Sequence, residues 1–392
     1  MRLPHLLVNL ALFVVATIVS VALLFGAGEL YLRVKAGGAT QYMPWMEFHP
    51  ERGWALKPGD YAGYEVNESR KTRILISDLG LRNSPVSPTV PPGRRRISVV
   101  GDSFVFGAAL EDSEIITGQL GHLLGDRCQV VNLGVEGYGT GQECLLVEDL
   151  AARGYAVGDA IVLVFFTNDI LDNLALSYGG GDPVPTTPRF WVDSTGALLH
   201  TRPQTRRTYP WGRKLAKNWM FYRYLRSRAT NLMLSNPWVH DLAGTLGFRP
   251  SLPRIPGVVE GFYSAGWQER WKNTEEILDY FSRLARGRLG SQLVVAFVPS
   301  PFQVMGTLRE MASRQARTDS IYAAYLADVD RPQRCLREFC DRSRLTFIDA
   351  TPALREAART RSPYLVEAHL NAFGSRIVAQ SIRDGITSRL SP

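Results

Sequence analysis

The sequence has few cysteines and histidines for its length, with four Cys and six His among 392 residues. So few cysteines exclude a small domain built on disulfides, and no Cys and His residues have the spacing of a zinc site. With 45% hydrophobic and 21% charged residues, the chain is not disordered, collagen-like or a protein of many membrane spans. Its length suits one large or two modest globular domains.

The four cysteines fall into two pairs. Cys335 and Cys340 are five residues apart and are expected on one helix, a spacing that is not ideal for a bridge and leaves a disulfide open. Cys128 and Cys144 lie among apolar residues and are predicted to pack in the core.

Charged residues are missing from a stretch near the N-terminus, Leu6 to Ala27. A helix of these 22 residues would be roughly 33 Å long, enough for a bilayer core of about 30 Å. A cleaved signal peptide usually has an apolar run of only about 7–15 residues, so we favour an uncleaved single-pass anchor. Gly26 and Gly28 leave a cleavage site open. The short tail before this stretch favours a cytoplasmic N-terminus with the rest of the chain exported.

From Ile97 onward, the order of apolar runs and helical segments predicts an α/β fold. Five short, continuously apolar runs alternate with segments of helical periodicity, which is typical of a doubly wound parallel sheet covered on both faces. The predicted strands are Ile97–Val100, Gln129–Asn132, Ala160–Phe166, Leu293–Val298 and Leu345–Ile348. The predicted helices include Gln142–Ala152, Trp267–Leu289, Ser320–Ser343 and one from Ala372 to Leu390.

The chain divides into three predicted parts. Residues 1–35 form the anchor, residues 36–95 an extended connector rich in Gly and Pro, and residues 96–392 the α/β domain. The gap between the third and fourth strands is too long for one crossover helix, so we expect an insertion at about 176–261.

The insertion lacks acidic residues between Ser194 and His240. A solvated lid, a surface that contacts anionic lipid and a surface that binds an acidic glycan all fit this pattern. Nucleic acid would attract the same charge, but export argues against it, so no nucleic-acid partner is expected. Its nine basic residues exceed the net charge of +8 for the whole chain; they are Arg202, Arg206, Arg207, Arg213, Lys214, Lys217, Arg223, Arg226 and Arg228.

Three strand ends carry candidate groups for acyl transfer. Ser103 follows the first strand, Gly137 lies in the glycine-rich turn after the second, and Asn168 follows the third. In open parallel sheets, sites form at the carboxyl ends of the strands. Ser103 fits a nucleophile, and its backbone N–H, the Gly137 N–H and the Asn168 side chain fit donors to an oxyanion. The structural alternatives are a helix cap for Ser103 and turn residues for Gly137 and Asn168.

A serine nucleophile needs a base, and His369 is the best placed of the six histidines. It precedes the predicted C-terminal helix, in a loop that follows the fifth strand and can reach the same sheet edge. Glu367, two residues earlier, is a candidate to orient the imidazole, or else a solvated loop residue. Asp102 and Asp169 are expected to bond backbone amides in their loops.

These segments resemble the ordered blocks of SGNH (GDSL-type) hydrolases. The matching segments are GDSF at 101–104, NLGVEGYGTGQE at 132–143, TND at 167–169 and EAHLN at 367–371. The resemblance implies a flavodoxin-like three-layer α/β/α fold, Ser103 as nucleophile, His369 as base, and an oxyanion hole of Ser103, Gly137 and Asn168. The family usually has Gly where Thr167 stands and Asp where Val366 or Glu367 stands, so Glu367 is a substitute for the usual acid.

The anchor and two further segments, Gly53-Trp54 to Gly59 and Gly80-Leu81-Arg82, resemble the leader of bacterial membrane-anchored members. The resemblance implies a single-pass inner-membrane protein with a periplasmic domain. It implies a serine esterase that acts on acyl, above all acetyl, esters of carbohydrates or small molecules, with no cofactor and no metal. The alternatives are an O-acetyltransferase that modifies an exported polysaccharide beside a membrane-bound acyltransferase, and a non-catalytic glycan-binding or assembly subunit.

Overall fold

The computed structural model describes residues 3–39, 43–65, 70–82, 86–107, 109–176, 187–203, 219–235, 239, 260–317, 319–365 and 369–387. The chain forms two compact units. The first consists of Met1–Met43, Ala62–Thr72 and Thr208–Leu252. The second, called here the sheet unit, consists of Pro44–Tyr61, Arg73–Arg207 and Pro253–Pro392.

The sheet unit is built on a five-stranded sheet in the order β11-β10-β7-β5-β6, with every pair parallel. Numbered along the chain, this order is 2-1-3-4-5, the flavodoxin-like doubly wound arrangement. The fold class and all five strands predicted from the sequence are therefore confirmed. The strands are β5 (Arg95–Gly101), β6 (Cys128–Gly134), β7 (Ala160–Phe165), β10 (Gln292–Phe297) and β11 (Thr346–Asp349).

Both faces of this sheet are covered, which explains why its strands are apolar throughout. On one face, Val99 and Val162 pack with Val378 of the last helix in the main core cluster. On the other face, Phe165 meets the edge of Trp271, with ring centroids 6.5 Å apart. A strand buried on both sides cannot alternate between polar and apolar residues, and β7 is buried at all six positions.

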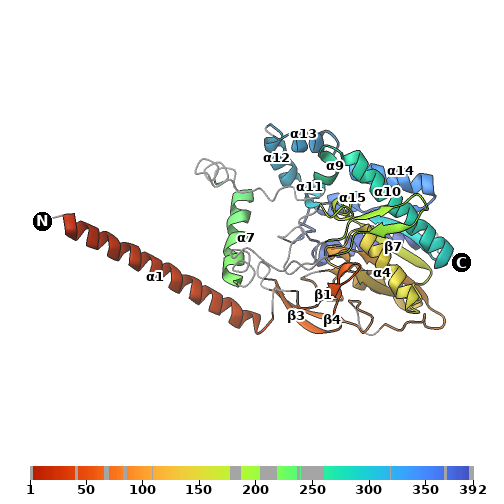
Figure 1. Cartoon of the computed structure of the whole chain (residues 1–392), viewed down its shortest axis with the longest axis horizontal. Helices are drawn as coiled ribbons and strands as arrows, with labels where there is room; N and C mark the ends of the chain where they lie inside the picture. Colours follow the sequence, from red (N-terminus) through yellow and green to blue (C-terminus); the bar gives the residue numbers. More distant parts are fainter. Residues whose placement is uncertain are drawn as a thin grey trace. The chain divides into compact units, whose positions relative to one another are not determined.

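Several helices of the sheet unit are labelled in Figure 1. The predicted helix over 320–343 is in fact two, because a turn at Asp328–Asp330 separates them and Pro332 lies in the first turn of the second. The helix predicted from Trp267 ends in a π-turn. Their bounds are α2 Ser103–Phe106, α3 Ile116–Leu124, α4 Thr140–Ala152, α5 Asp169–Asp172, α9 Glu260–Tyr263, α10 Trp267–Arg283 with the π-turn Leu284–Arg288, α11 Pro301–Val304, α12 Gly306–Gln315, α13 Ser320–Ala327, α14 Arg331–Ser343, α15 Thr351–Ala357 and α16 Ala372–Thr387, with a 3₁₀ turn at Gly125–Arg127.

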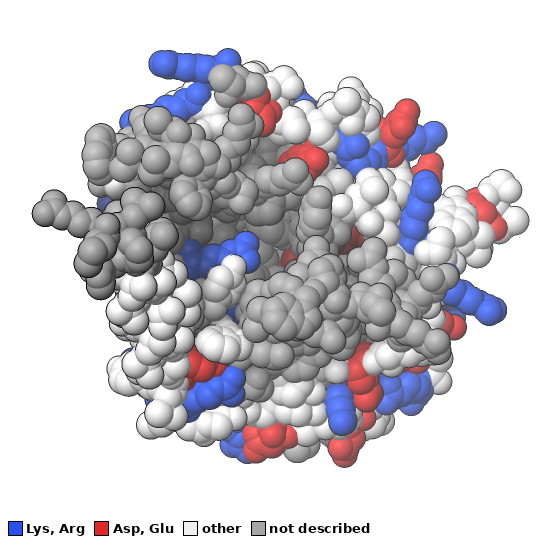
Figure 2. Space-filling model, turned by 60° about the vertical axis from the view of Figure 1, so that its left-hand side comes forward, with Lys and Arg blue, Asp and Glu red and all other residues white. Residues whose placement is uncertain are grey.

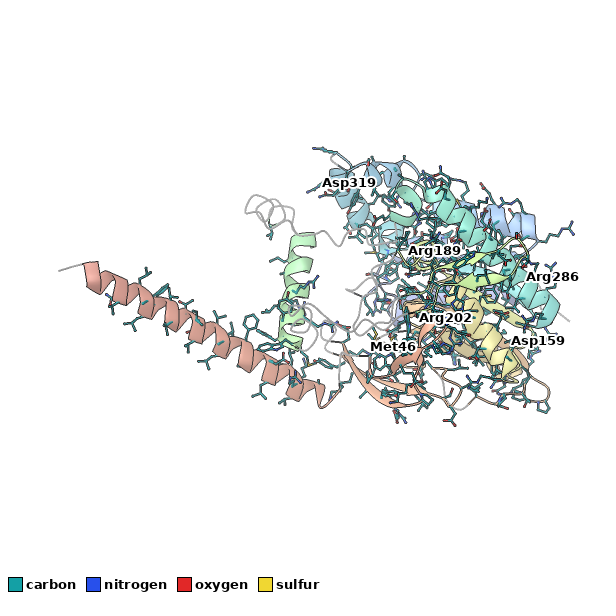
Figure 3. All side chains as sticks on the ribbon, in the orientation of Figure 1. Met46, Asp159, Arg189, Arg202, Arg286 and Asp319 are labelled. Carbon is teal, nitrogen blue, oxygen red and sulfur yellow. The ribbon has the colours of Figure 1, made fainter. Side chains whose placement is uncertain are left out.

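Short two-stranded sheets lie outside the main sheet. Among the described residues before β5, β1 (Met46–His49) pairs with β2 (Gly53–Leu56), and β3 (Gly59–Glu65) pairs with β4 (Arg70–Ile76), each strand having at most seven residues. Within the predicted insertion, β8 (Phe190–Val192) pairs with β9 (Leu198–His200). Figure 3 labels Met46 of β1, and Arg189 and Arg202, which flank the β8–β9 pair.

The first unit contains helix α1 (Leu3–Ala36), which continues unbroken for 34 residues (Figure 1). Its apolar stretch, Val8–Ala36, has the length and composition of a membrane anchor or a signal sequence, and its most apolar window is not buried by other residues. Helix α7 (Met220–Ser235) packs on its C-terminal part, where the Phe221 N–H donates to Glu29 Oε2 at 2.9 Å. Leu32 and Met220 belong to the same small apolar cluster.

The charges of the described residues are mixed in sign. Basic and acidic side chains lie side by side around the rim of the face shown in Figure 2. Ion pairs such as Arg342–Glu275 and Arg355–Asp330 join neighbouring elements of the sheet unit. Of the nine basic residues singled out in the insertion, Arg206, Arg207, Arg213, Lys214 and Lys217 lie outside the described residues.

All four cysteines are free. Cys335 and Cys340 both lie buried on α14 without a disulfide between them. Cys144 is fully buried and Cys128 half-buried, in keeping with packing roles.

Candidate active site

The nucleophile candidate Ser103 lies directly after β5, as the first residue of the short helix α2. Asp102 caps this helix, because its Oδ1 accepts a hydrogen bond from the Phe104 N–H at 2.9 Å. Gly134 at the end of β6 lets α2 pass close by, since a Cβ there would lie 2.2 Å from the Phe106 nitrogen. The expected backbone bond of Asp102 is therefore present, and this turn leaves the Ser103 side chain partly exposed.

The structure brings His369 to Ser103, although 266 positions separate them in sequence. Nε2 of His369 lies 2.8 Å from Oγ of Ser103. The imidazole also packs on the Phe104 ring, with centroids 5.3 Å apart. With a proton on Nδ1, Nε2 is free to accept the Ser103 hydroxyl proton.

The loop that carries His369 is held at both ends. The Leu365 N–H donates to the His369 carbonyl at 2.7 Å, and the Asn371 side chain caps the start of α16 through the Gly374 N–H at 3.0 Å. Gly374 allows a close approach, because a Cβ there would meet the Pro363 carbonyl at 2.2 Å. These contacts hold the backbone of His369 and of the start of α16 in place.

Burial of the imidazole lowers the pKa of His369 to about 4. The neutral form therefore dominates at neutral pH, and a neutral imidazole is the form that acts as a base. Glu367, predicted to orient the ring, lies outside the described residues, so its role stays a prediction.

Gly137 lies in a tight turn over residues 135–138. The Tyr138 N–H donates to the Val135 carbonyl at 3.2 Å, and Gly137 has a φ of 75°. Glu136 has no positive φ, so the turn is of type II, in which glycine is favoured at the third position. The Val135 N–H donates to the Gly101 carbonyl at 3.0 Å, which ties the turn to the strand that precedes Ser103.

Two backbone donors predicted for an oxyanion are unengaged. Among the described residues, none accepts a hydrogen bond from the N–H of Ser103 or of Gly137. Gly137 is exposed, and the Ser103 N–H belongs to the first turn of α2. Both groups are therefore available to a ligand.

Asn168 is already engaged. Its Nδ2 donates to Asp102 Oδ2 at 3.1 Å, and its Oδ1 is buried with no partner among the described residues. Burial raises the pKa of Asp172 well above its usual range, the Asp102 charge raises it further, and a hydrogen bond from Asn168 opposes them. The side-chain N–H groups of Asn168 thus face the carboxyl groups of Asp102 and Asp172. To reach an oxyanion, one of these N–H groups would have to break its bond to a carboxyl group.

Buried carboxyl groups gather behind these strand ends. Burial raises the pKa of Asp102 to about 6, and it raises those of Glu143 and Asp169 well above their usual range. Neither oxygen of Glu143 has a hydrogen-bond partner among the described residues. Asp169 does not bond the expected backbone amide; instead Thr140 Oγ1 donates to its Oδ2 at 3.4 Å, because α4 begins beside it.

Two tryptophans, which sequence reasoning did not assign to the site, donate hydrogen bonds to Glu136, the residue before Gly137. The Trp54 indole N–H donates to the Glu136 carbonyl at 2.9 Å, and the Trp45 indole N–H donates to Glu136 Oε2 at 3.2 Å. Burial raises the pKa of Glu136 to about 7, and the Trp45 bond opposes this. The signal in the sequence was the Gly53-Trp54 pair, noted only as part of the leader.

Among the described residues, no group of three or more His, Cys, Asp and Glu side chains is arranged to hold a metal ion. The groups that the structure places at these strand ends include a hydroxyl, an imidazole and backbone N–H donors.

Comparison with known proteins gives structural neighbours alone. No protein-family model and no curated protein matches the sequence. Among solved structures, a carbohydrate acetylesterase family member from Sinorhizobium meliloti is 12% identical, with a TM-score of 0.37 over 75% of this chain and 99% of that one. A lipolytic protein of the G-D-S-L family from Veillonella parvula is 13% identical, with a TM-score of 0.37 over 75% and 99%. A catalytic mutant of an acetylxylan esterase from Geobacillus stearothermophilus is 12% identical, with a TM-score of 0.33 over 76% and 96%.

Proposed function

We propose that this chain is a serine esterase of the SGNH type, which cleaves acyl esters through an acyl-serine intermediate. The observation that carries the proposal is the 2.8 Å contact between His369 Nε2 and Ser103 Oγ. A nucleophile and base within hydrogen-bond reach are the minimum that this chemistry requires. An N-cap role alone would not explain the contact, because Asp102 already caps α2.

In the first half-reaction, Ser103 Oγ attacks the ester carbonyl carbon and its proton passes to His369 Nε2. The carbonyl oxygen becomes an oxyanion, which the N–H groups of Ser103 and Gly137 stabilise. Asn168 is the third proposed donor, and one of its N–H groups turns from a carboxyl partner to reach the oxygen. The C–O bond to the leaving alcohol then breaks, and the proton on His369 goes to the departing oxygen.

In the second half-reaction, His369 takes a proton from water, and the resulting hydroxide equivalent attacks the acyl-serine carbonyl. Collapse of the second tetrahedral intermediate frees the acid and returns the proton to Ser103. An acceptor hydroxyl in place of water yields O-acyl transfer by the same groups, and the outcome depends on whether water is excluded. Acetyl groups are the proposed acyl class and carbohydrate esters the proposed substrates.

Helix α1 is proposed as an uncleaved anchor that places the catalytic unit outside the cytoplasm, in the periplasm of a bacterium. Its length and composition support this, since a helix of 34 residues exceeds what a bilayer core of about 30 Å requires. A membrane-bound acyltransferase as partner belongs to the transfer alternative.

The test measures two properties of the full-length protein in detergent: hydrolysis of p-nitrophenyl acetate and labelling by a fluorophosphonate. Ser103→Ala is expected to abolish both, and His369→Ala to reduce hydrolysis by about 10⁴-fold or more. Ser313→Ala, at an exposed position on α12, is the matched control and should leave both unchanged. Labelling that persists in Ser103→Ala refutes Ser103 as the nucleophile. No labelling of the native protein refutes the proposal and favours a non-catalytic subunit.

Hydrolysis and transfer are separated with an acetylated donor and a polysaccharide acceptor. Release of acetate without acetylation of the glycan supports the esterase. Acetylated glycan that depends on Ser103 supports the transferase.

A further inference from the structure

We infer that Trp54 is a positioning residue for the proposed reaction: its indole N–H holds the peptide between Glu136 and Gly137 so that the Gly137 N–H faces the oxyanion. This inference rests on the proposed function. It concerns β2, in the segment between the apolar helix and the sheet, to which no catalytic part has been given so far.

The argument begins with the peptide group. In a trans peptide the C=O and the following N–H point in opposite directions. The Trp54 indole N–H donates to the Glu136 carbonyl at 2.9 Å, so this carbonyl points towards Trp54. The Gly137 N–H therefore points away from Trp54, where none of the described residues accepts its hydrogen bond.

A β-turn of this length can adopt either of two common types. Types I and II differ by rotation of the central peptide through about 180°, with only type II requiring a positive φ at the third residue. Gly137 has that positive φ, at 75°. Glycine permits type II but does not enforce it, since it adopts negative φ as readily. An external hydrogen bond to the central carbonyl selects one state, and Trp54 supplies it.

Trp54 is itself held rigidly. Its side chain is buried, and its ring packs on Tyr138 with centroids 5.6 Å apart. The Tyr138 hydroxyl donates to the Trp54 carbonyl, and Gln142 Nε2 donates to the Arg52 carbonyl at 2.7 Å. The benzo ring also stands beside Gly137, where a Cβ would lie 3.4 Å from Cζ2 of Trp54. The hydrogen bond to the Glu136 carbonyl and the packing of the benzo ring beside Gly137 thus favour the same orientation of the turn.

Trp45 provides a matched comparison. Its indole N–H also donates to Glu136, at 3.2 Å, but to the side chain rather than to the carbonyl of the central peptide. Loss of that bond leaves the peptide orientation in place. Trp45→Phe and Trp54→Phe each remove one indole N–H and keep an aromatic ring, so they differ in which oxygen of Glu136 loses its donor.

The test compares kcat, KM and the inhibition constant of an alkyl boronic acid, whose tetrahedral adduct with Ser103 places an oxygen in the oxyanion hole. For Trp54→Phe we expect kcat to fall roughly 10- to 100-fold, less than the 10²–10³-fold for outright removal of a donor. KM should stay within about twofold, and the boronic acid should bind more weakly by a factor similar to the loss in kcat. Trp45→Phe should change each quantity by less than about twofold.

Activities are referred to active sites counted by fluorophosphonate titration, and Trp54→Tyr is the second variant in case Trp54→Phe does not fold. The inference is overturned if folded Trp54→Phe keeps its kcat, if only KM changes, or if Trp45→Phe loses as much. Absence of Ser103-dependent turnover in the native protein overturns the proposed function, and this inference with it. Turnover that survives the loss of the Trp54 N–H overturns this inference alone.

Discussion

The two ends of the five-stranded sheet treat buried charge in opposite ways. At the amino end, Arg96 is fully buried, and all five of its guanidinium N–H groups have acceptors. At the carboxyl end, Glu143 is equally buried, yet neither of its carboxyl oxygens has a partner among the described residues. Asp159, labelled in Figure 3, marks the amino end, where its Oδ2 accepts the Arg96 N–H at 3.0 Å.

Arg96 shows how a buried charge can join a fold together. Its acceptors are the Gln129 side chain and four carbonyl oxygens, and the guanidinium lies 4.7 Å from the centroid of the Tyr155 ring. The contacts reach β6, the residues before β5 and the turn before β7; the four carbonyls are those of Ser87, Pro88, Thr89 and Ala156. This end of the sheet is thus built for stability.

At the carboxyl end, buried acidic groups lower stability when they are charged. Burial disfavours the charged forms of Asp102, Glu143 and Asp169, and the Asp102 charge disfavours those of Glu143 and Asp169 further. Natural proteins keep such unfavourable groups mainly where function requires them. Substitution of a buried carboxyl group near Ser103 should therefore raise the stability of the protein, whereas substitution of Arg96 should lower it.

The largest effect on stability is expected at the amino end. Arg96→Met removes five hydrogen bonds and leaves four buried carbonyls without this donor, so it should destabilise the protein by about 3 kcal/mol or more. The turnover number per folded molecule should not change, because Arg96 lies at the far end of the strand from Ser103. Urea unfolding and activity measured on the same samples test both parts.

The control is the preceding residue. Arg95 is exposed, so Arg95→Met should change stability by about 0.5 kcal/mol or less. Equal losses in the two variants would mean that the buried network is not the source of stability at this end.

The sequence was sufficient to predict the five strands and the meeting of Ser103 with His369. Strands buried on both faces leave an apolar signature without alternation, and parallel strands bring their carboxyl ends to one edge. Chemistry at that edge then follows from the residue types in the loops, because a serine there needs a base. The catalytic roles of these residues, and of Gly137, Asn168 and Glu367, stay predictions until activity is measured.

Other features depend on contacts that no local pattern encodes. Trp54 meets Glu136 across 82 positions of sequence, and its segment has neither helical nor strand periodicity over a useful length. The engagement of Asn168 with Asp102 was also not predicted, since an asparagine after a strand looks the same whether its amide faces a ligand or a buried acid. The division between α13 and α14 has a visible signal in Pro332, because proline favours the first turn of a helix.

A smaller effect of opposite sign is expected at the carboxyl end. Glu143→Gln keeps the shape of the side chain and is neutral without taking up a proton, so it should stabilise the protein at pH 8 by about 1 kcal/mol. In the native protein the raised pKa of Glu143 means that the folded state holds a proton that the unfolded state releases. Stability from this group is therefore present below its unfolded pKa and is lost as the pH rises through the folded value.

Thermal unfolding between pH 5 and pH 8 measures this difference, and Glu143→Gln should flatten the decline towards pH 8. Glu356→Gln is the control, because Glu356 is exposed and pairs with Arg359 only at the surface. A decline that is as steep in Glu143→Gln as in the native protein would place the cause elsewhere in the carboxyl cluster.

The smallest expected effect concerns the pH dependence of kcat/KM. It tests whether His369 stays neutral beside the buried carboxyl groups at the carboxyl end of the sheet. Burial lowers the pKa of His369 to about 4, so activity should vary by less than about twofold from pH 6 to pH 8 and fall only in more acidic solution.

Asp102, whose pKa burial raises to about 6, is a second group that can cause an acidic decline, and it contacts the site through Asn168. Asp102→Asn separates the two groups, since an asparagine can still cap α2. If the acidic decline stays at the same pH in that variant, it belongs to His369; if it lies near pH 6.5 in the native protein, the imidazole has a partner that restores its ordinary pKa, which is the role predicted for Glu367.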